Sequence, residues 1–214
     1  MKNAFAALRE EMVSRQILSR GIDDSSLLEA FRNIPRHFFV PEDQKKFAYN
    51  DCPLPIGWEQ TISQPYIVAL MTLHLSLSKG TLVLEVGTGS GYQAAILAFL
   101  GARVYTIERF SPLAKEAKRV LDSLGMKIRI REGDGTLGWS EHAPYERIIV
   151  TAGTSKIPPL LIEQLKVGGK MVIPLGQRFR QELTVVEKIS ETEIKEERVC
   201  GCMFVPLVGE YGWS

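Results

Sequence analysis

The stretch Leu82-Val83-Leu84-Glu85-Val86-Gly87-Thr88-Gly89-Ser90-Gly91-Tyr92 combines an apolar run, one carboxylate and three glycines at alternate positions. A second apolar run with small residues, 93–100, follows at once. This order predicts a buried strand, a tight loop and a helix. Glycine suits such a loop because the backbone turns with positive φ and a ligand must approach where a Cβ would stand. The loop opens a helix, so its free N–H groups face whatever binds there.

The same alternation of strand and helix continues on both sides of this stretch. The patterns predict strands at 82–86, 103–108, 127–132, 147–151 and 170–174, with helices at 66–77, 93–100, 111–125 and 158–166. Residues 181–189 and 197–207 alternate around Ser190-Glu191 and predict a β-hairpin. The sequence therefore predicts an α/β fold: a Rossmann-like, doubly wound, mostly parallel sheet of about seven strands that ends in an antiparallel hairpin.

Two helices are expected before this core. Apolar positions at helical spacing in residues 7–34 are divided near Gly21, and the second helix is expected to begin after an N-cap at Asp24 and to end before Pro35. Residues 35–60 are rich in proline, glycine and aromatics and predict an ordered surface loop region. We expect one domain over 1–214, organised as N-terminal helices and loop (1–60), cofactor-binding core (61–175) and C-terminal hairpin and tail (176–214).

Composition argues against several classes of partner. The chain has 26 Lys and Arg against 25 Asp and Glu, so its net charge of +1 provides no general attraction for nucleic acid. Its most apolar windows, 66–77 and 94–102, are shorter than the roughly 18 to 20 residues of a membrane span. Residues 1–5 begin no long apolar segment of the kind found in export signals. We expect a monomer in the cytoplasm, with no membrane or nucleic-acid partner and no metal site.

Three acidic residues follow the ends of predicted parallel strands, where open α/β sheets bind ligands. They are Glu85, Glu108 and Asp134. Glu108 lies 21 residues after Gly87, close to the spacing of roughly 20 at which an acid meets the hydroxyls of a ribose. The pattern favours a nucleoside ligand over the alternative of ordinary turn glycines and solvated acids.

Charge indicates which nucleoside is expected. Glu85 stands two residues before the first glycine, where it would oppose the pyrophosphate of a dinucleotide and favour the sulfonium and ammonium of S-adenosylmethionine. The glycine pattern agrees weakly, because Tyr92 stands where the dinucleotide fingerprint requires glycine. We therefore expect S-adenosylmethionine as the cofactor.

Ser63 has two interpretations on local pattern alone. It lies in Thr61-Ile62-Ser63-Gln64-Pro65, directly before a predicted apolar helix. A serine two residues before a proline is a good N-cap, since its oxygen can accept an unpaired N–H of the first turn. Capping is the commoner role for such a residue, and catalysis is the alternative.

Five stretches resemble the protein-L-isoaspartate (D-aspartate) O-methyltransferase family, over nearly the whole chain. They are Thr61-Ile62-Ser63-Gln64-Pro65-Tyr66, the stretch from Leu84 to Tyr92, Gly133-Asp134-Gly135, Ala143-Pro144-Tyr145 with the following Ile148-Ile149-Val150-Thr151-Ala152, and Phe204-Val205-Pro206-Leu207. The glycine loop is shared with many methyltransferases, whereas the Thr-Ile-Ser-x-Pro segment and the Val-Pro-Leu ending are specific. Glu59 departs from the family, whose members more usually have glycine there, which affects the expected shape of this loop.

The resemblance implies a role for each matching residue. It makes Ser63 the active-site serine and places Thr61 and Ile62 with it at the substrate. It implies that Glu85 and the glycine loop, with Gly87, Thr88, Gly89 and Gly91, hold the methionine part of the cofactor. Glu108 is then expected to hold the ribose and Asp134 to reach the adenine amino group. Arg109 and Gly135 are expected among the cofactor-binding residues. The implied reaction is methyl transfer from S-adenosylmethionine to the free α-carboxylate of L-isoaspartyl residues in damaged proteins and peptides, which initiates repair.

Such a carboxylate needs no strong general base. Its reference pKa is about 3.3 to 3.7, so it is already ionised near neutral pH. His37, His74 and His142 are therefore expected to be surface or packed side chains. Two other functions remain open: a nucleic-acid methyltransferase, although Thr151-Ala152-Gly153 provides no Asn/Asp-Pro-Pro-aromatic base pocket, and a nucleotide-binding module without catalysis.

Overall fold

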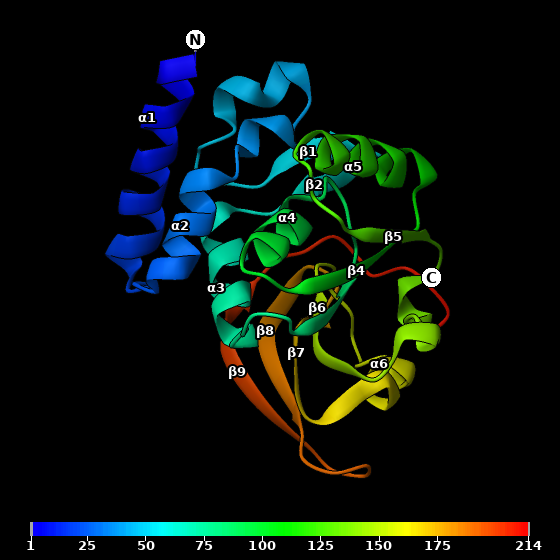
Figure 1. Cartoon of the computed structure of the whole chain (residues 1–214). Helices are drawn as coiled ribbons and strands as arrows, with labels where there is room; N and C mark the ends of the chain where they lie inside the picture. The colour runs from blue at the N-terminus through cyan, green and yellow to red at the C-terminus, as the bar shows by residue number, and fades with distance from the viewer. Residues whose placement is uncertain (1, 214) are drawn as a thin grey trace.

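The computed structural model describes the backbone of residues 2–213 and the side chains of residues 5–213. Its centre is a seven-stranded sheet in the order β5-β4-β3-β6-β7-β8-β9 (Figure 1). The strands are β3 (Leu82–Val86), β4 (Arg103–Glu108), β5 (Arg129–Glu132), β6 (Tyr145–Val150), β7 (Leu165–Gln177), β8 (Arg180–Lys188) and β9 (Ile194–Cys202). β3 to β7 pair in parallel, and β8 and β9 add two antiparallel strands. The predicted mostly parallel sheet with a C-terminal antiparallel hairpin is confirmed.

The strand order reverses direction next to β3. β4 and β5 lie on one side of it, whereas β6 and the strands after it lie on the other. In open α/β sheets, the two loops that leave such a point diverge and leave a crevice beyond the carboxyl ends of the strands. The loop after β3 is the glycine loop, so the topology places this loop at the crevice.

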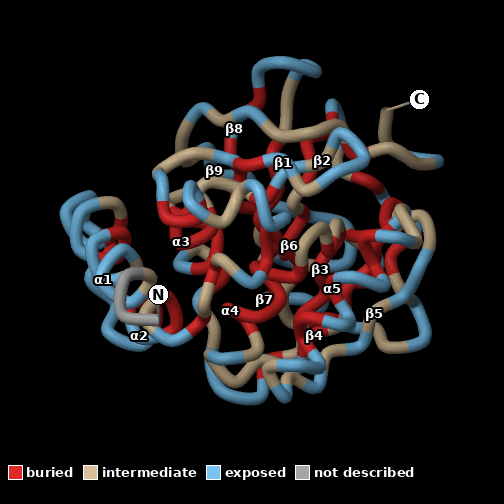
Figure 2. Tube along the Cα trace, turned by 90° about the horizontal axis from the view of Figure 1, so that it is seen from above, coloured by how far each residue is buried: buried red, intermediate tan, exposed pale blue. Residues whose placement is uncertain are grey.

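Helices cover both faces of the sheet. They are α3 (Pro65–Leu75), α4 (Tyr92–Phe99), α5 (Ser111–Ser123) and the short α6 (Pro159–Gln164). Successive residues of a strand point to opposite faces, so Val83 packs in the apolar cluster with α3 and α4, whereas Leu84 packs in the cluster with α6. The sheet and the inner faces of these helices form the buried interior in Figure 2.

The N-terminal part packs beside α3 and α4. It contains α1 (Lys2–Met12), a π-helical turn η1 (Val13–Ile17), a 3₁₀ turn η2 (Leu18–Arg20) and α2 (Ser25–Asn33). The Asp24 side chain accepts a hydrogen bond from the Leu27 amide at 2.8 Å, and α2 ends at Asn33. The predicted cap and the predicted end before Pro35 are therefore confirmed.

Residues 35–62 contain more regular structure than the sequence predicted. Two 3₁₀ turns, η3 (Arg36–Phe38) and η4 (Glu42–Phe47), precede an antiparallel hairpin of β1 (Leu54–Gly57) and β2 (Gln60–Ile62). The hairpin was not predicted, because both strands are very short and β1 contains Pro55. It also joins residues on both sides of the boundary at 60 that the domain prediction used. That division stays a prediction, and its first and last residues, 1 and 214, lie outside the described residues.

Two boundaries near the C-terminus also differ from the prediction. β7 begins at Leu165, within the predicted helix, and continues through Gly168-Gly169, with an irregularity where it pairs with β6. β9 ends at Cys202, and the chain then crosses to Gly153 after β6, where the Leu207 amide donates to the Gly153 carbonyl at 2.7 Å. Residues 203–208 are thereby brought over the carboxyl ends of the parallel strands. Within residues 2–213, no helix has the length and apolar character needed to cross a membrane.

Candidate active site

A cleft of about 430 Å³ opens at the carboxyl ends of β3, β4 and β6. Its walls come from the β1–β2 turn, the glycine loop, the end of β4, the residues after β6, the β7–β8 turn and residues 205–208. Two smaller hollows adjoin this cleft, and both are lined by Ser63. Thr61 and Thr151 line all three cavities. The cavities therefore meet between the Thr61–Ser63 segment and the end of β6.

The glycine loop has the conformation that its sequence predicted. Gly87, Gly89 and Gly91 have φ of 95°, 52° and 88°, a region that other residues rarely adopt. A Cβ on Gly87 would overlap the hydroxyl of Thr151, and a Cβ on Gly91 would stand 3.1 Å from Leu121 Cδ1. Glycine is thus needed for the turn and for the close approach of β6 and α5.

Glu108 ends β4 and lines the cleft, with only 5% of its surface exposed. Its Oε2 accepts a hydrogen bond from the Gly89 amide at 2.8 Å, and its Oε1 accepts one from the Phe110 amide at 2.9 Å. The carboxylate therefore fixes the glycine loop relative to β4. Because a carboxylate has about four acceptor sites, both oxygens can still accept further hydrogen bonds from a ligand.

Glu85 is fully buried in the middle of the sheet, next to Thr106 of β4. Within the described residues, neither carboxyl oxygen has a hydrogen-bond partner. Burial raises the pKa of Glu85 to about 8; the nearby Thr106 hydroxyl lowers it and the Glu108 carboxylate adds to the increase. Thr106 in turn bonds to the hydroxyl of Thr88 at 2.7 Å, and Thr88 lines the hollow beside Ser63. An unpaired buried acid next to this hollow suits a ligand with a positively charged group.

Asp134 follows β5 and joins the C-terminal segment to the site. Its Oδ1 accepts from the amide and hydroxyl of Thr136, and its Oδ2 accepts from the Glu210 amide at 2.7 Å. Burial alone would raise the pKa of Asp134, but these hydrogen bonds hold it below its usual range. Gly135 lines the cleft and Asp134 does not. Its contact with an adenine amino group stays a prediction.

Ser63 is partly buried between the two smaller hollows. α3 begins at Pro65 with Gln64 as its N-cap, and no side chain caps it. The capping interpretation of Ser63 is therefore wrong, because the helix begins one residue later than that role requires. Thr61 is exposed, whereas Ile62 is 3% exposed and anchors the segment in the core. The structure thus brings Thr61 and Ser63 to the glycine loop.

A family model described as protein-L-isoaspartate (D-aspartate) O-methyltransferase matches residues 7–212 of this chain. The chain belongs to this family. A protein-L-isoaspartate O-methyltransferase from Geobacter metallireducens is 55% identical over 211 residues and covers 98% of each chain. Another, from Syntrophus aciditrophicus, is 54% identical over 217 residues and covers 100% of each. The resemblance inferred from the sequence motifs is confirmed.

Solved structures of the isoaspartate methyltransferase family have the same fold. One protein-L-isoaspartate O-methyltransferase has a TM-score of 0.86 and 29% identity, covering 95% of this chain and 67% of that chain. A structure from Plasmodium falciparum, described as a beta-aspartate methyltransferase in complex with S-adenosyl-L-homocysteine, has a TM-score of 0.81 at 24% identity, covering 94% and 98%. At that identity the second likeness concerns the fold alone.

Several residues at the site of this family member were not identified from its sequence. Thr151 donates a hydrogen bond from Oγ1 to the Gly87 carbonyl at 2.6 Å, which ties the end of β6 to the glycine loop. Its place directly after a parallel strand is the signal that could have found it. Trp58, Arg178 and Phe179 also line the cleft, but they come from turns far away in sequence, and no local pattern relates them to the glycine loop. Arg109, which is one of the predicted cofactor residues, also lines the cleft, and its side chain is exposed.

The three histidines lie away from the cleft and its two adjoining hollows. His37 stacks on Phe5 with ring centroids 4.1 Å apart, and His142 packs against Tyr105. His74 lies in the last turn of α3. Burial lowers the pKa of both His37 and His74.

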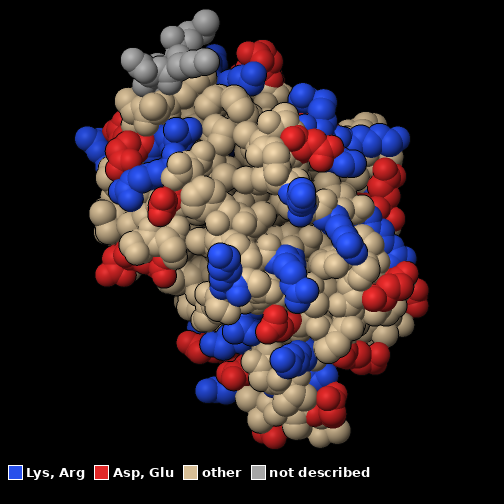
Figure 3. Space-filling view, in the orientation of Figure 1, with Lys and Arg blue, Asp and Glu red and all other residues tan. Residues whose placement is uncertain are grey.

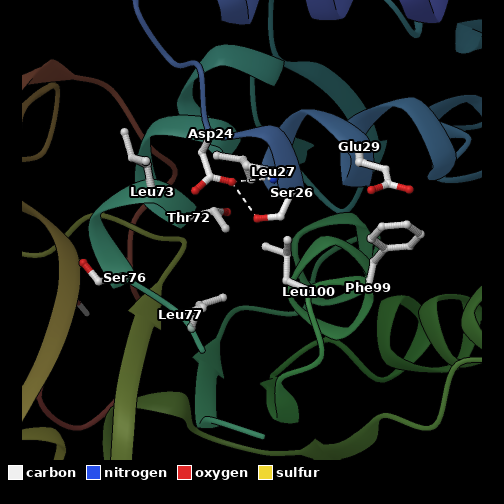
Figure 4. Close-up of a pocket in the computed structure, with 10 residues that line it drawn as sticks. All are labelled: Asp24, Ser26, Leu27, Glu29, Thr72, Leu73, Ser76, Leu77, Phe99 and Leu100. Carbon is white, nitrogen blue, oxygen red and sulfur yellow. Dashed lines mark hydrogen bonds between the residues drawn. The ribbon is translucent and has the colours of Figure 1, made fainter. Parts of the chain in front are cut away.

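A further hollow of about 290 Å³ lies between α2, α3 and the end of α4 (Figure 4). Two of its polar side chains bond within the protein: Asp24 accepts hydrogen bonds from Leu27 and Ser26, and the Thr72 hydroxyl donates to the Val68 carbonyl at 2.7 Å. None of the residues that line the cleft or its two adjoining hollows lines this hollow, so it is separate from the candidate site.

Proposed function

We propose that this protein transfers a methyl group from S-adenosylmethionine to the free α-carboxylate of L-isoaspartyl residues in damaged proteins and peptides, and so initiates their repair. The observation that carries the proposal is the meeting of three cavities at Thr61 and Thr151. Glu108 and the glycine loop line the large cleft, and Ser63 lines the hollows beside it. A cofactor and a separate carboxylate can therefore approach each other there. Membership of the family supports the reaction.

The residues of the site fit S-adenosylmethionine. The glycine loop leaves space where side chains would stand, and Glu85 is an unpaired buried acid next to the hollow that adjoins Ser63. Glu108 would bond the ribose hydroxyls, Gly87 to Gly91 would hold the methionine part, and Glu85 would balance its positive charge. When bound, the cofactor supplies a methyl group on a sulfonium, which an ionised carboxylate can attack without a base.

The protein's own contribution is orientation. The substrate carboxylate is ionised above about pH 5, so no residue has to remove a proton from it. In this proposal Ser63 donates its hydroxyl hydrogen to one carboxylate oxygen; its position on both hollows supports the role, and Thr61 borders the same junction. Holding the substrate carboxylate at a fixed position and orientation would supply a large part of the rate enhancement, because a bimolecular reaction then becomes effectively intramolecular.

The class of substrate, the oligomeric state of the protein and its location in the cell are part of the same proposal. The face seen in Figure 3 carries Lys and Arg as well as Asp and Glu, with several Lys and Arg side chains near its centre, and the net charge of +1 provides no general attraction for nucleic acid, which supports a protein substrate. We propose a cytoplasmic monomer. Sedimentation of the purified protein tests the monomer, and fractionation of the source cells tests the location.

A methyl-transfer assay tests the function. Labelled S-adenosylmethionine is offered with three acceptors: an isoaspartyl peptide, the same peptide with ordinary aspartate, and RNA. We expect label in the isoaspartyl peptide alone. Label in RNA would instead establish a nucleic-acid methyltransferase. Cofactor binding without transfer to any acceptor would establish a binding module.

A further inference from the structure

Arg36 is the largest side chain that is completely buried in the described part of the chain. It follows Pro35 in η3, more than twenty residues before the Thr61–Ser63 segment. Arginine is almost never fully buried unless it is paired, so its presence in the core requires an explanation.

The guanidinium of Arg36 joins three separate parts of the protein. Nε donates a hydrogen bond to the Ala48 carbonyl at 2.8 Å, and Nη2 donates one to the Ser63 carbonyl at 2.7 Å. Its central carbon lies 4.9 Å from the centroid of the Tyr92 ring. Tyr92 is the first residue of α4, directly after Gly91 of the glycine loop. One buried group therefore contacts the N-terminal region, the Ser63 segment and the start of the cofactor-binding helix.

No carboxylate neutralises this charge among the described side chains. Asp51 is the carboxylate that acts electrostatically on Arg36, but its ion pair is with Arg20. Burial lowers the pKa of Arg36 to about 10, so the group stays protonated at neutral pH. Its Nη1 has no hydrogen-bond partner within the described residues. Such a buried charge, bonded to carbonyls and a ring and with one donor unpaired, is not explained by a gain in stability. Well-packed apolar side chains would stabilise the core as well or better.

The contact with Ser63 explains what the arginine achieves. Helical bonding of α3 begins at the Gln64 carbonyl, which accepts from the Val68 amide at 3.1 Å, so the Ser63 carbonyl lies just outside the helix. Arg36 supplies the donor that α3 does not. Fixing this carbonyl fixes the peptide that carries the Ser63 side chain, next to the cavity junction.

We propose that Arg36 is a positioning residue for methyl transfer, which holds Ser63 in register with the glycine loop by donating to the Ser63 carbonyl while packing on Tyr92. It acts through Ser63 and touches neither substrate nor cofactor. The role rests on the proposed function, in which Ser63 orients the substrate carboxylate. Nε and Nη2 of the planar guanidinium each donate to a carbonyl, and a lysine ammonium cannot reach both carbonyls in the same geometry.

The test compares Arg36→Lys and Arg36→Met with the parent protein. Single-turnover methyl transfer to an isoaspartyl peptide and the affinity for S-adenosylmethionine are measured at a temperature where circular dichroism shows full folding. We expect transfer to fall at least tenfold in both variants, with cofactor affinity within about twofold of the parent, since a displaced Ser63 affects only the reacting carboxylate. Amide exchange of residues 61–64 should accelerate while that of α5 stays unchanged.

The matched control is Gln16→Leu. Gln16 donates to the Tyr49 carbonyl at 2.7 Å, next to Ala48, so it ties the same region without reaching Ser63. We expect a lower melting temperature and unchanged transfer. Three results would overturn the proposal. The first is a transfer rate that falls in proportion to the melting temperature across all variants. The others are a cofactor affinity that falls as much as the transfer rate does, and failure of both Arg36 variants to fold. A parent protein that does not methylate the peptide would refute the proposed function itself, which separates the two failures.

Discussion

Glu85 and Glu108 show how the same residue type acquires different properties from its surroundings. Glu108 is the last residue of β4 and Glu85 the last but one of the neighbouring β3, but Glu108 accepts two backbone hydrogen bonds, whereas Glu85 has no partner within the described residues. An unpaired carboxylate in the interior favours its neutral form. Glu85 therefore holds a proton in the ligand-free protein at neutral pH and would lose it to solvent when a cationic ligand binds nearby.

Glu85→Gln should make the empty protein more stable, by an amount that depends on pH. The carboxyl ionises near pH 4.5 when unfolded and near pH 8 when folded, so between these values the folded state binds one more proton. The stability that Glu85 contributes is present below pH 4.5 and is lost as pH rises toward 8. Relative to the parent, the variant's free energy of unfolding should rise by about 1.4 kcal/mol per pH unit in this window.

Urea unfolding without cofactor, at several pH values across this window, measures the effect. Glu196→Gln is the control, because Glu196 is exposed on β9 and its loss should give a curve parallel to the parent's. A parallel curve for Glu85→Gln as well would show that Glu85 is ionised in the folded protein.

Ser63→Ala should reduce methyl transfer with little change in stability. Loss of an N-cap costs roughly 0.5 to 2 kcal/mol, but Ser63 makes no cap bond, so its removal should cost less than this. Asp24→Ala provides the opposite case, since Asp24 caps α2 far from the cleft: we expect lost stability and normal transfer. Thermal melting and single-turnover transfer on the same preparations decide the assignment. A destabilised Ser63→Ala variant with normal turnover would return the residue to a structural role.

At the scale of elements, the β1–β2 hairpin covers the glycine loop. Ile56 Cδ1 would stand 3.5 Å from a Cβ on Gly89, and Trp58 stacks on Phe110 with ring centroids 6.3 Å apart. The turn between the strands has three successive residues with positive φ: Gly57 at 92°, Trp58 at 55° and Glu59 at 57°. Strain of this kind is found where a loop must hold a functional position.

Glu59→Gly should stabilise the protein by about 1 kcal/mol, because glycine adopts positive φ without the steric penalty of a side chain. A position with this φ suits glycine, the residue that the family resemblance led us to expect there. Thermal melting measures the gain. Lys115→Gly in the exposed face of α5 is the control and should destabilise by about 1 kcal/mol. A loss of stability in Glu59→Gly would mean that contacts of the glutamate outweigh the strain.

At the scale of the whole molecule, the parallel core could be predicted because its information is local. Apolar runs, glycines and strand-end acids identify β3, β4 and β6 and the edge where ligands bind. Distant segments could not be placed in this way. Long-range packing alone brings three segments to the site: Arg36, the Phe179 turn and Pro206. The strands of the β1–β2 hairpin are too short to show the alternation of apolar and polar residues that identifies a strand. The unpaired state of Glu85 likewise depends on the strand register that places it opposite Thr106.

The last prediction concerns the pH dependence of the whole enzyme. The three histidines lie in separate parts of the fold, in η3, in α3 and in the 3₁₀ turn η6 (Ser140–His142), and none lines the cleft or its adjoining hollows. The substrate carboxylate is already ionised, so the chemical step should be flat between about pH 5.5 and 7.5. Single-turnover transfer is measured with saturating cofactor, because Glu85 titrates near this range and would change cofactor affinity in the proposed site.

Replacing His37, His74 and His142 with glutamine, one at a time, should leave this rate within a few-fold of the parent. Single turnover matters because a steady-state rate can report product release instead of chemistry. The stability of each variant is measured in parallel, since His37 bonds to the Tyr49 hydroxyl at 2.7 Å and its loss should lower the melting temperature without changing transfer. A rate that falls below pH 6.5 in the parent, and that one substitution abolishes without unfolding, would establish a general base. The nucleophile would then carry a proton at neutral pH, which a carboxylate does not.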